Sequence, residues 1–421
     1  MTRCRFPYGS GFLTISLPFG YNITFLKSRF IKGMENPVEA IVNSIRAPIG
    51  SPPLSERLRA EAKVAVIVTD NTRACPDAVM LPPILAEIEQ KVPAKNITII
   101  LALGLHAPLN RDEMIKKLGS QIIAKYKVIN HDAGRTVNLG ATSRGIPVNI
   151  NREVVEADFR ISTGFIEPHL FAGFSGGRKS IFPGVSGSRS IRLNHGFDMI
   201  DHPLARAGIL KGNPVHEDMV EQARIAKLDF IVNVLLNEKK EITHIFSGDP
   251  FLAHERGCEM EKDIAAVKVA HQFDIVLTTN SGSPLDLDFY QTCKGIDNAS
   301  RIIRPGGIII IAAACDTGLG PAEFESFHAA GSTPQGVLQK IKDESPKGVP
   351  WQNQVLARVQ TINDIYLISE LDAIQAKRMM VIPFPTIDLA LSRALEVLGR
   401  KSEIAVMPEG PMVLPFLEAG A

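Results

Sequence analysis

The segment Pro168–Ser180 carries residue types from which an active site is readily built. Within it lie a histidine, His169, a run of glycines and a lysine, Lys179. Two further histidines, His106 and His195, come before and after it. Histidine titrates near neutral pH, lysine can form covalent adducts, and glycine lets a phosphate or a ring approach the backbone. This combination predicts an enzyme that holds a cofactor.

Polar residues also follow two expected strands directly. Asp70 and Arg73 come after the apolar run 64–68, and His106 comes after the run 97–102. The carboxyl ends of strands form the usual ligand-binding edge of an α/β sheet. Arg73 could hold a carboxylate there through two hydrogen bonds, and His106 could act as an acid or a base. The alternatives are a capped turn with a solvated arginine, and a histidine that only satisfies a loop carbonyl.

The glycine-rich loop 173–180 resembles a phosphate-binding P-loop, Gly-x4-Gly-Lys-Ser, but departs from it at Arg178. That position must be glycine if the backbone amides are to wrap around a phosphate. We therefore interpret the loop as a phosphate or cofactor cradle of another kind, with Ser175, Gly176 and Gly177 as candidate contacts. The alternative is a tight glycine turn with exposed cations.

Gln291 and Lys294 lie three residues apart at the start of an expected helix, so they share one of its faces. Lys294 could supply a second cation to a ligand. The alternative is a solvated lysine, which the local sequence by itself favours.

Short β-branched runs alternate with helical stretches along the chain, a pattern typical of an α/β fold. Most of the runs are continuously apolar, as in parallel sheets covered by helices on both faces. We expect strands at 64–68, 97–102, 160–163, 230–234, 275–278, 308–312, 380–382 and 404–406, and helices at 81–91, 111–118, 213–226 and 386–398.

The chain is long enough for more than one domain, and a boundary is expected near residues 268–274. We predict a cofactor-binding and catalytic domain at 1–270, to which 402–421 returns, and a second α/β domain at 271–401. Ligands commonly bind where two domains meet, so we expect the active site in the cleft between them.

Charge and hydropathy give no indication of nucleic-acid or membrane partners. The net charge is +1, from 46 basic and 45 acidic residues. No apolar run approaches the roughly 18 residues of a membrane helix, and the first 33 residues lack a signal-peptide core. We expect a cytoplasmic protein.

The five cysteines are scattered and never spaced as Cys-x-x-Cys, which argues against a disulfide framework and a structural zinc site. No His-Glu-x-x-His motif occurs either. If a transition metal is bound, the protein supplies few of its ligands.

Six short motifs occur together in one order: Asp70-x-x-Arg73, Gly104-x-His106, Pro168-His169, Gly176-Gly177-Arg-Lys179, Asn194-His195 and Gln291-x-x-Lys294. In this the chain resembles the nickel-pincer-nucleotide-dependent lactate racemase family over nearly its whole length. The resemblance implies a two-domain α/β racemase or epimerase of 2-hydroxy acids. It also implies a cofactor made of nickel and pyridinium-3-thioamide-5-thiocarboxylic acid mononucleotide, and maturation proteins that make and deliver it.

The resemblance assigns roles to residues of this chain. Lys179 would be the covalent attachment point of the cofactor, and His195 the one protein ligand to nickel. His106 and His169 would be the acid/base pair. The substrate would be held by Arg73, Gln291 and Lys294, and the cofactor-adjacent turn would contain Asp70 and Thr72.

The implied chemistry is physically consistent. Nickel(II) favours square-planar donors, and three pincer atoms plus one imidazole make four. A carboxylate barely acidifies the neighbouring C–H, so transferring the C2 hydrogen as hydride avoids a poor carbanion. Lactate, malate, aryl-lactates and sugar acids all remain possible substrates. The competing interpretations are a P-loop-like phosphotransferase, a non-catalytic cofactor-binding protein of a nickel pathway, and an NAD-dependent dehydrogenase, which the missing third glycine of its fingerprint disfavours.

Overall fold

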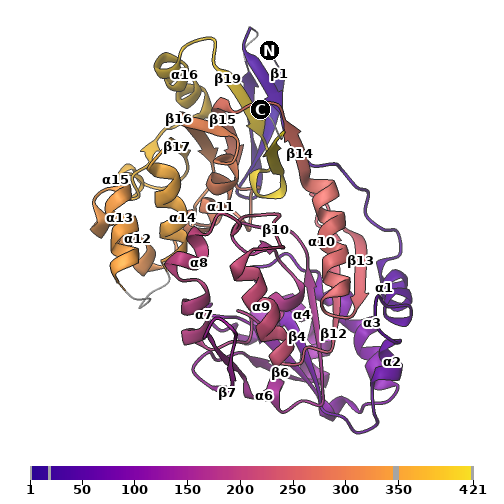
Figure 1. Cartoon of the computed structure of the whole chain (residues 1–421). Coiled ribbons are helices and arrows are strands. Elements are labelled where there is room, and N and C mark those ends of the chain that lie inside the picture. The colour runs from indigo at the N-terminus through magenta and orange to yellow at the C-terminus, as the bar shows by residue number, and fades with distance from the viewer. Residues whose placement is uncertain (1, 18–19, 345–349, 419–421) are drawn as a thin grey trace. The chain divides into compact units, whose positions relative to one another are not determined.

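The computed structural model describes residues 2–17, 20–344 and 350–418, which belong to two compact units (Figure 1). Unit 1 comprises Met1–Arg29, Gly196–Asp201 and Ile264–Ala421, and unit 2 comprises Phe30–His195 and His202–Asp263. Each unit contains a largely parallel sheet flanked by helices, which confirms the predicted α/β class. Within the described ranges, no helix is long and apolar enough to cross a membrane.

The described residues of unit 2 include a six-stranded sheet in the order β13-β12-β9-β4-β5-β6. Its pairs are parallel except for β13, which runs antiparallel to β12 at the edge. Strand β4 is buried at five of its six positions, as a sheet covered on both faces requires. The strands are β13 (Ile242–Gly248), β12 (Phe230–Leu236), β9 (Phe159–Phe165), β4 (Val64–Thr69), β5 (Ile97–Ala102) and β6 (Lys127–Asn130).

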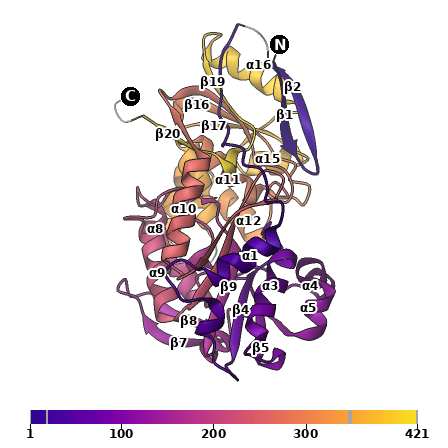
Figure 2. The same ribbon diagram turned by 90° about the vertical axis from the view of Figure 1, so that its right-hand side faces the viewer.

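Successive side chains of these strands point to opposite faces and build two cores. Val66 and Ile99 belong to one core, which also contains side chains from α1 to α5; the ribbons of α1, α3, α4 and α5 are labelled in Figure 2. Ile67 and Ile100 belong to the other, with side chains from α6, α9 and α10. The helices are α1 (Pro37–Arg46), α2 (Leu54–Arg57), α3 (Asp77–Glu89), α4 (Arg111–Leu118), α5 (Ser120–Lys125), α6 (Arg152–Val155), α9 (Pro214–Ile225) and α10 (Leu252–Ala265).

Several shorter elements of unit 2 carry the motifs singled out in the sequence. The β7–β8 and β10–β11 pairs are antiparallel, and the glycine-rich loop ends in a short 3-10 helix, η2. These elements are β7 (Thr136–Ala141), β8 (Pro147–Asn151), β10 (Pro168–His169), β11 (Gly173–Phe174), η2 (Gly177–Ser180) and α7 (Ser188–Asn194).

Unit 1 has a second six-stranded sheet among its described residues, with all pairs parallel, in the order β18-β17-β16-β15-β19-β3. One face packs on the β1–β2 hairpin and α16, and the other on α11, α12, α14 and α15. The strands are β18 (Ile382–Pro383), β17 (Asp364–Ile368), β16 (Ile303–Ala312), β15 (Phe273–Thr279), β19 (Glu403–Met407), β3 (Asn22–Phe25), β1 (Thr2–Tyr8) and β2 (Gly11–Leu17). The helices are α8 (Phe197–Asp201), α11 (Phe289–Ala299), α12 (Ala322–Gly331), α13 (Pro334–Asp343), α14 (Trp351–Gln360), α15 (Ala373–Arg378) and α16 (Ile387–Leu398).

Residues 402–421, which we expected to return to the first domain, group with unit 1 in the structure. Strand β19 lies between β15 and β3, and β20 (Leu414–Leu417) pairs with β14 (Ala266–Val269). The physical reason is that β19 is apolar on both sides: Ile404 faces one core of unit 1 and Ala405 faces the other.

Candidate functional site

Three neighbouring strands of unit 2 bring most of the predicted residues to one edge of the sheet. Strands β9, β4 and β5 are adjacent and parallel, so their carboxyl ends lie side by side. Asp70 and Arg73 follow β4, His106 follows β5, and His169 lies in β10 shortly after β9. The carboxyl edge of a parallel sheet is the expected place for a ligand.

Asp70 orients His106. The Nδ1 atom of His106 lies 2.5 Å from Asp70 Oδ2, and Asp70 Oδ1 accepts hydrogen bonds from the Thr72 hydroxyl at 2.6 Å and the Thr72 amide at 3.0 Å. Burial by itself raises the pKa of Asp70, but the hydrogen bond and charge of His106, with the charge of Arg73, outweigh it and hold that pKa below its ordinary value. Asp70 is therefore a carboxylate that accepts the Nδ1 proton of His106. Nε2 of that ring is then the nitrogen available for proton transfer.

The segment that carries His106 packs against the turn that follows Lys179. The amide of Gly104 donates to the Gly184 carbonyl at 2.9 Å, and the amide of Gly184 donates to the Lys179 carbonyl at 3.2 Å. A Cβ atom on Gly184 would lie 2.3 Å from the Ser180 carbonyl oxygen, so only glycine permits this approach. His106 and Lys179 are thus positioned by backbone segments in direct contact.

Arg178, the residue that breaks the P-loop pattern, is buried. It is 1% exposed, and its guanidinium donates to the carbonyls of Ala172 at 2.6 Å and Gly176 at 3.2 Å. Burial lowers the pKa of Arg178 to about 10, which leaves it charged at neutral pH. The interpretation of this loop as a turn with exposed cations is therefore wrong at Arg178, whose charge shapes the loop from within.

The amides of the same loop are bonded inside the protein. The N–H groups of Ser175, Gly177 and Lys179 donate to protein oxygens at 2.9, 2.7 and 3.1 Å. A P-loop needs its amides to point at a phosphate. The amides of Ser175, Gly177 and Lys179 therefore depart from the arrangement of a P-loop.

The glycines of the loop allow close packing. A Cβ atom on Gly176 would lie 2.6 Å from Asn233 Oδ1, and one on Gly177 would lie 2.5 Å from His254 Cγ. The Ser175 hydroxyl donates to the Phe165 carbonyl at 2.9 Å. These three candidate cofactor contacts thus each have a packing or bonding role inside unit 2.

His195 caps the carboxyl end of α7 and is 5% exposed. Its Nδ1 atom lies 2.8 Å from Oδ1 of Asn194. Burial, and after it the charge of Lys179, hold the pKa of His195 well below its ordinary value, so the ring is neutral at neutral pH. The structure thus brings Lys179 close enough to His195 to interact with it electrostatically.

His169 and His195 are linked through one aromatic ring. Phe171 makes edge-to-face contacts with both, at centroid distances of 4.8 Å to His169 and 4.9 Å to His195. The amide of Ala172 lies 3.4 Å from Nδ1 of His169 and helps to orient that ring. Phe171 therefore acts as a spacer between the two imidazoles, a role that its sequence position did not indicate.

Gln291 and Lys294 belong to unit 1, on the first turns of α11, and both are half-buried. The helix begins at an N-cap, Asp288, whose carboxylate accepts the Gln291 amide at 2.7 Å. The adjacent Tyr290 accepts a hydrogen bond at its hydroxyl from Trp351 Nε1 at 2.7 Å. Both predicted residues thus lie on the same part of a well-capped helix, as their spacing suggested.

The fold and these residues match those of one family of proteins. The lactate racemase N-terminal domain matches residues 8–208, and the lactate racemase C-terminal domain matches residues 268–414. The chain belongs to the lactate racemase family, as the resemblance of its motifs predicted.

Individual relatives agree with this assignment. The chain is similar to the lactate racemase of Thermoanaerobacterium thermosaccharolyticum, with 34% identity over 98% of this chain and 99% of that protein. It is also similar to the lactate racemase of Lactiplantibacillus plantarum, with 36% identity over 88% of this chain and 89% of that protein.

Solved structures support the same conclusion about the fold. The lactate racemase apoprotein from T. thermosaccharolyticum superposes with a TM-score of 0.92 and 33% identity, over 98% of this chain and 100% of that one. A Thermotoga maritima protein at 18% identity shares the fold with a TM-score of 0.69, over 90% of this chain and 98% of that one.

The residues of unit 2 fit a cofactor that brings most of its own metal donors. Among the described residues, no three His, Cys, Asp or Glu side chains converge on a possible metal ion. His195 is a single neutral imidazole beside an amine, Lys179. A metal held there would need further donors from a bound organic group, and the amine offers a point of attachment for one.

Proposed function

We propose that this protein inverts the C2 configuration of a 2-hydroxy acid, lactate or a related acid, by reversible hydride transfer. The observation that carries the proposal is the convergence of an oriented acid/base, His106, a second imidazole, His169, and the Lys179–His195 pair around one sheet edge of unit 2. Membership of the lactate racemase family supports it.

Lys179 and His195 would hold the cofactor, a nickel-pincer nucleotide. When bound, that group supplies an electron-poor carbon that takes up the C2 hydride and returns it. The neutral state of His195 suits a metal ligand, because a protonated imidazole cannot donate a lone pair. The covalent bond would be an amide-type link through Nζ of Lys179.

His106 and His169 would move the hydroxyl proton. The two enantiomers present their hydroxyl groups on opposite sides of C2, so each needs its own imidazole. His106 would keep donating its Nδ1 proton to Asp70 and would take or give a proton at Nε2. Each acid/base residue is worth roughly 10²–10⁴ in rate.

The substrate carboxylate requires a cation, and Arg73 and Lys294 are our candidates, with Gln291 as a hydrogen-bonding partner. Arg73 lies close enough to Asp70 to lower its pKa, so it is part of the same edge. A guanidinium can bind a carboxylate through two parallel hydrogen bonds. We propose a cytoplasmic location and dependence on maturation proteins that supply the cofactor.

The first test is polarimetry of the cofactor-loaded protein with single enantiomers of lactate, malate, aryl-lactates and sugar acids. Racemisation of one of them supports the proposal, and optical stability of all of them rejects it. A substrate deuterated at C2 distinguishes the chemistry, because hydride transfer retains the label and proton abstraction exchanges it with water.

The second test addresses the attachment site. Intact-mass measurement of the loaded protein should show an added mass that Lys179→Ala abolishes. The exposed Lys211 provides the matched control, since Lys211→Ala should keep the adduct. An adduct that survives Lys179→Ala would rule out that residue as the attachment point.

A further inference from the structure

Asn194 connects His195 to a buried carboxylate. Oδ1 of Asn194 lies 2.8 Å from Nδ1 of His195, and its Nδ2 donates to Asp218 Oδ2 at 2.8 Å. Asn194 is fully buried, and Asp218 is 1% exposed. All three residues belong to unit 2.

The hydrogen bonds determine which way the amide points. Nδ2 of Asn194 faces two acceptors, the Asp218 carboxylate and the Val215 carbonyl at 3.3 Å. An amide nitrogen only donates, so the opposite atom, facing His195, must be the oxygen. An oxygen there can only accept, and the proton between them belongs to Nδ1 of His195. The lone pair of the neutral ring is then on Nε2.

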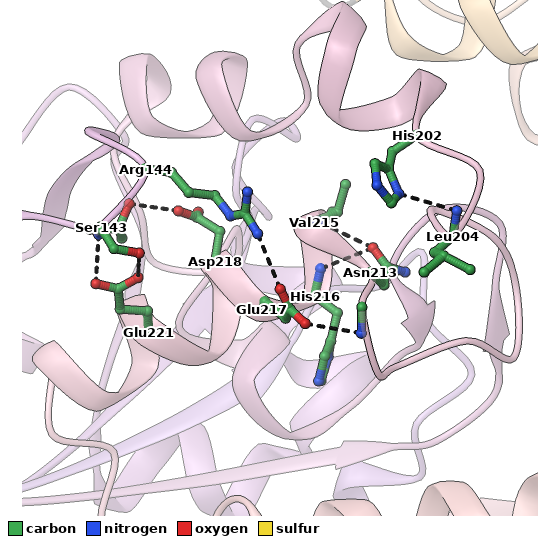
Figure 3. Close-up of polar contacts among 12 residues, drawn as sticks. Ser143, Arg144, His202, Leu204, Asn213, Val215, His216, Glu217, Asp218 and Glu221 are labelled. Atoms are coloured by element: carbon green, nitrogen blue, oxygen red, sulfur yellow. Dashed lines mark hydrogen bonds and ion pairs between the residues drawn. The ribbon is translucent and has the colours of Figure 1, made fainter.

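Asp218 is itself held in place by other donors. Its Oδ1 accepts the Thr142 hydroxyl at 2.7 Å, and its Oδ2 also accepts the Gln222 amide at 2.8 Å. Figure 3 shows this side of α9, where Arg144, in the turn between β7 and β8, forms an ion pair with Glu217 of the helix. Contacts with α9 and with the β7–β8 turn thus hold the Asp218 carboxylate in place, and that carboxylate orients the Asn194 amide.

We propose that Asn194, anchored by Asp218, is a positioning residue that sets the tautomer and orientation of the His195 ring, so that the lone pair on Nε2 would be available to the nickel. That His195 binds nickel rests on the proposed function, whereas the tautomer of its ring does not. A histidine that binds a metal generally donates its other ring N–H to a hydrogen-bond acceptor in the protein. Losing that acceptor typically costs about 10–100-fold in metal affinity or activity.

The test begins with the apoprotein labelled with ¹⁵N-histidine. Long-range ¹H–¹⁵N correlation distinguishes the protonated from the unprotonated ring nitrogen, and His195→Gln identifies the signals. Wild type should show the proton on Nδ1. A proton on Nε2 overturns the inference whatever the metal does, and the only variant this measurement needs is His195→Gln, which assigns the signals.

Variants then measure the contribution of each residue to the tautomer and to nickel retention. Asn194→Leu should no longer hold the ring proton of His195 on Nδ1, and it should shorten nickel retention of the loaded protein by about 10–100-fold. Asp218→Asn should have a smaller effect, because an amide oxygen can still accept from Asn194. Glu221→Gln, on the same helix but bonded to Ser143, should leave both readouts unchanged. An unaltered tautomer in folded Asn194→Leu, checked by circular dichroism, overturns the inference.

The proposed function has its own readout in the same experiment. Full nickel retention by His195→Ala would reject His195 as the ligand, while the tautomer signal of wild type would still decide the role of Asn194.

Discussion

The two units end their parallel sheets in chemically different ways. At the carboxyl edge of the unit 2 sheet, polar side chains meet one another, as Asp70 meets His106. At the corresponding edge in unit 1, they bond the backbone: Thr278 donates to the Met407 carbonyl at 3.0 Å and Thr279 to the Pro408 carbonyl at 2.6 Å. The carboxyl edge of a sheet can therefore be purely structural. It can form a binding site only where its polar side chains are not all bonded to the backbone.

The buried carboxylates differ in the same sense. Asp70 is bonded to an imidazole, whereas Asp286 in unit 1 accepts the backbone amides of Gly9 at 2.7 Å and Ala314 at 3.1 Å. A backbone amide is too weak an acid and too weak a base to serve as the proton-transfer group of a reaction at neutral pH. In the function that we propose, the proton chemistry therefore belongs to unit 2, and Gln291 and Lys294 of unit 1 are the candidates for substrate binding.

The largest effect should come from removing an imidazole at the unit 2 edge. His106→Ala and His169→Ala should each lower kcat by roughly 10²–10⁴, because an acid/base group is lost. Thr279→Val at the unit 1 edge should instead cost about 1–3 kcal/mol of stability, because its hydroxyl donates to the Pro408 carbonyl and accepts from the Ser281 amide. Steady-state kinetics and urea unfolding measure the two. A normal kcat in either histidine variant would remove that residue from the mechanism.

The next largest effect is expected at the carboxylates. Asp70→Asn removes a charged hydrogen bond worth about 1.5–3 kcal/mol, so kcat should fall roughly 10–100-fold with a smaller change in KM. Asp286→Asn should lower the unfolding midpoint and leave kcat near wild type. Equal kinetic losses in the two variants would contradict the distinction between the units.

Two glycines allow a matched steric comparison. A Cβ atom on Gly184 in unit 2 would lie 2.3 Å from the Ser180 carbonyl oxygen, and one on Gly410 in unit 1 would lie 2.5 Å from Thr278 Oγ1. Each alanine variant should cost about 1–3 kcal/mol through overpacking. Only Gly184→Ala should also reduce activity of the folded protein, because it displaces the turn after Lys179. Thermal unfolding and kcat of each variant check this.

The smallest effect concerns acid stability. Burial, and then the charge of Arg178, lower the pKa of His254 to about 3. Between pH 6.5 and that value the unfolded chain binds a proton that the folded chain does not, so stability is full above about pH 6.5 and falls as the pH drops. His254→Gln should reduce the fall by up to about 1.4 kcal/mol per pH unit. Urea midpoints at pH 7 and pH 5 test it, with the exposed His271→Gln as the control; identical slopes would contradict the assignment.

The interior strands could be predicted from sequence because they are continuous runs of β-branched residues. The runs at 64–68 and 97–102 appear as β4 and β5, extended by at most one residue. The strand expected at 380–382 begins only at Ile382. Met380 has a φ of +55°, which belongs to the turn after the preceding helix and is not a strand conformation. Edge strand β13 was not predicted because Thr243, His244 and Ser247 interrupt its apolar run, although it pairs with β12 in a local hairpin.

The candidate site was predicted in its residue types but not in its supporting contacts. Asp70 and His106 could each be placed after the end of a predicted strand, but the adjacency of the two strands and the direct bond could not be predicted. The burial of Arg178 was missed because the carbonyls it binds become neighbours only after the loop closes on itself. Asp218 gave no signal, because an acidic residue in the middle of a helix is ordinarily solvated.

The pairing of β3 with β19 has a consequence for synthesis of the chain. Asn22 and Glu403 are register partners although 381 residues separate them. On a ribosome β3 emerges long before β19, so it must wait unpaired while unit 2 is completed, whereas β1 and β2 can pair with each other. Unit 2 should therefore fold first, and an exposed β3 would be the point at which nascent chains are most exposed to aggregation.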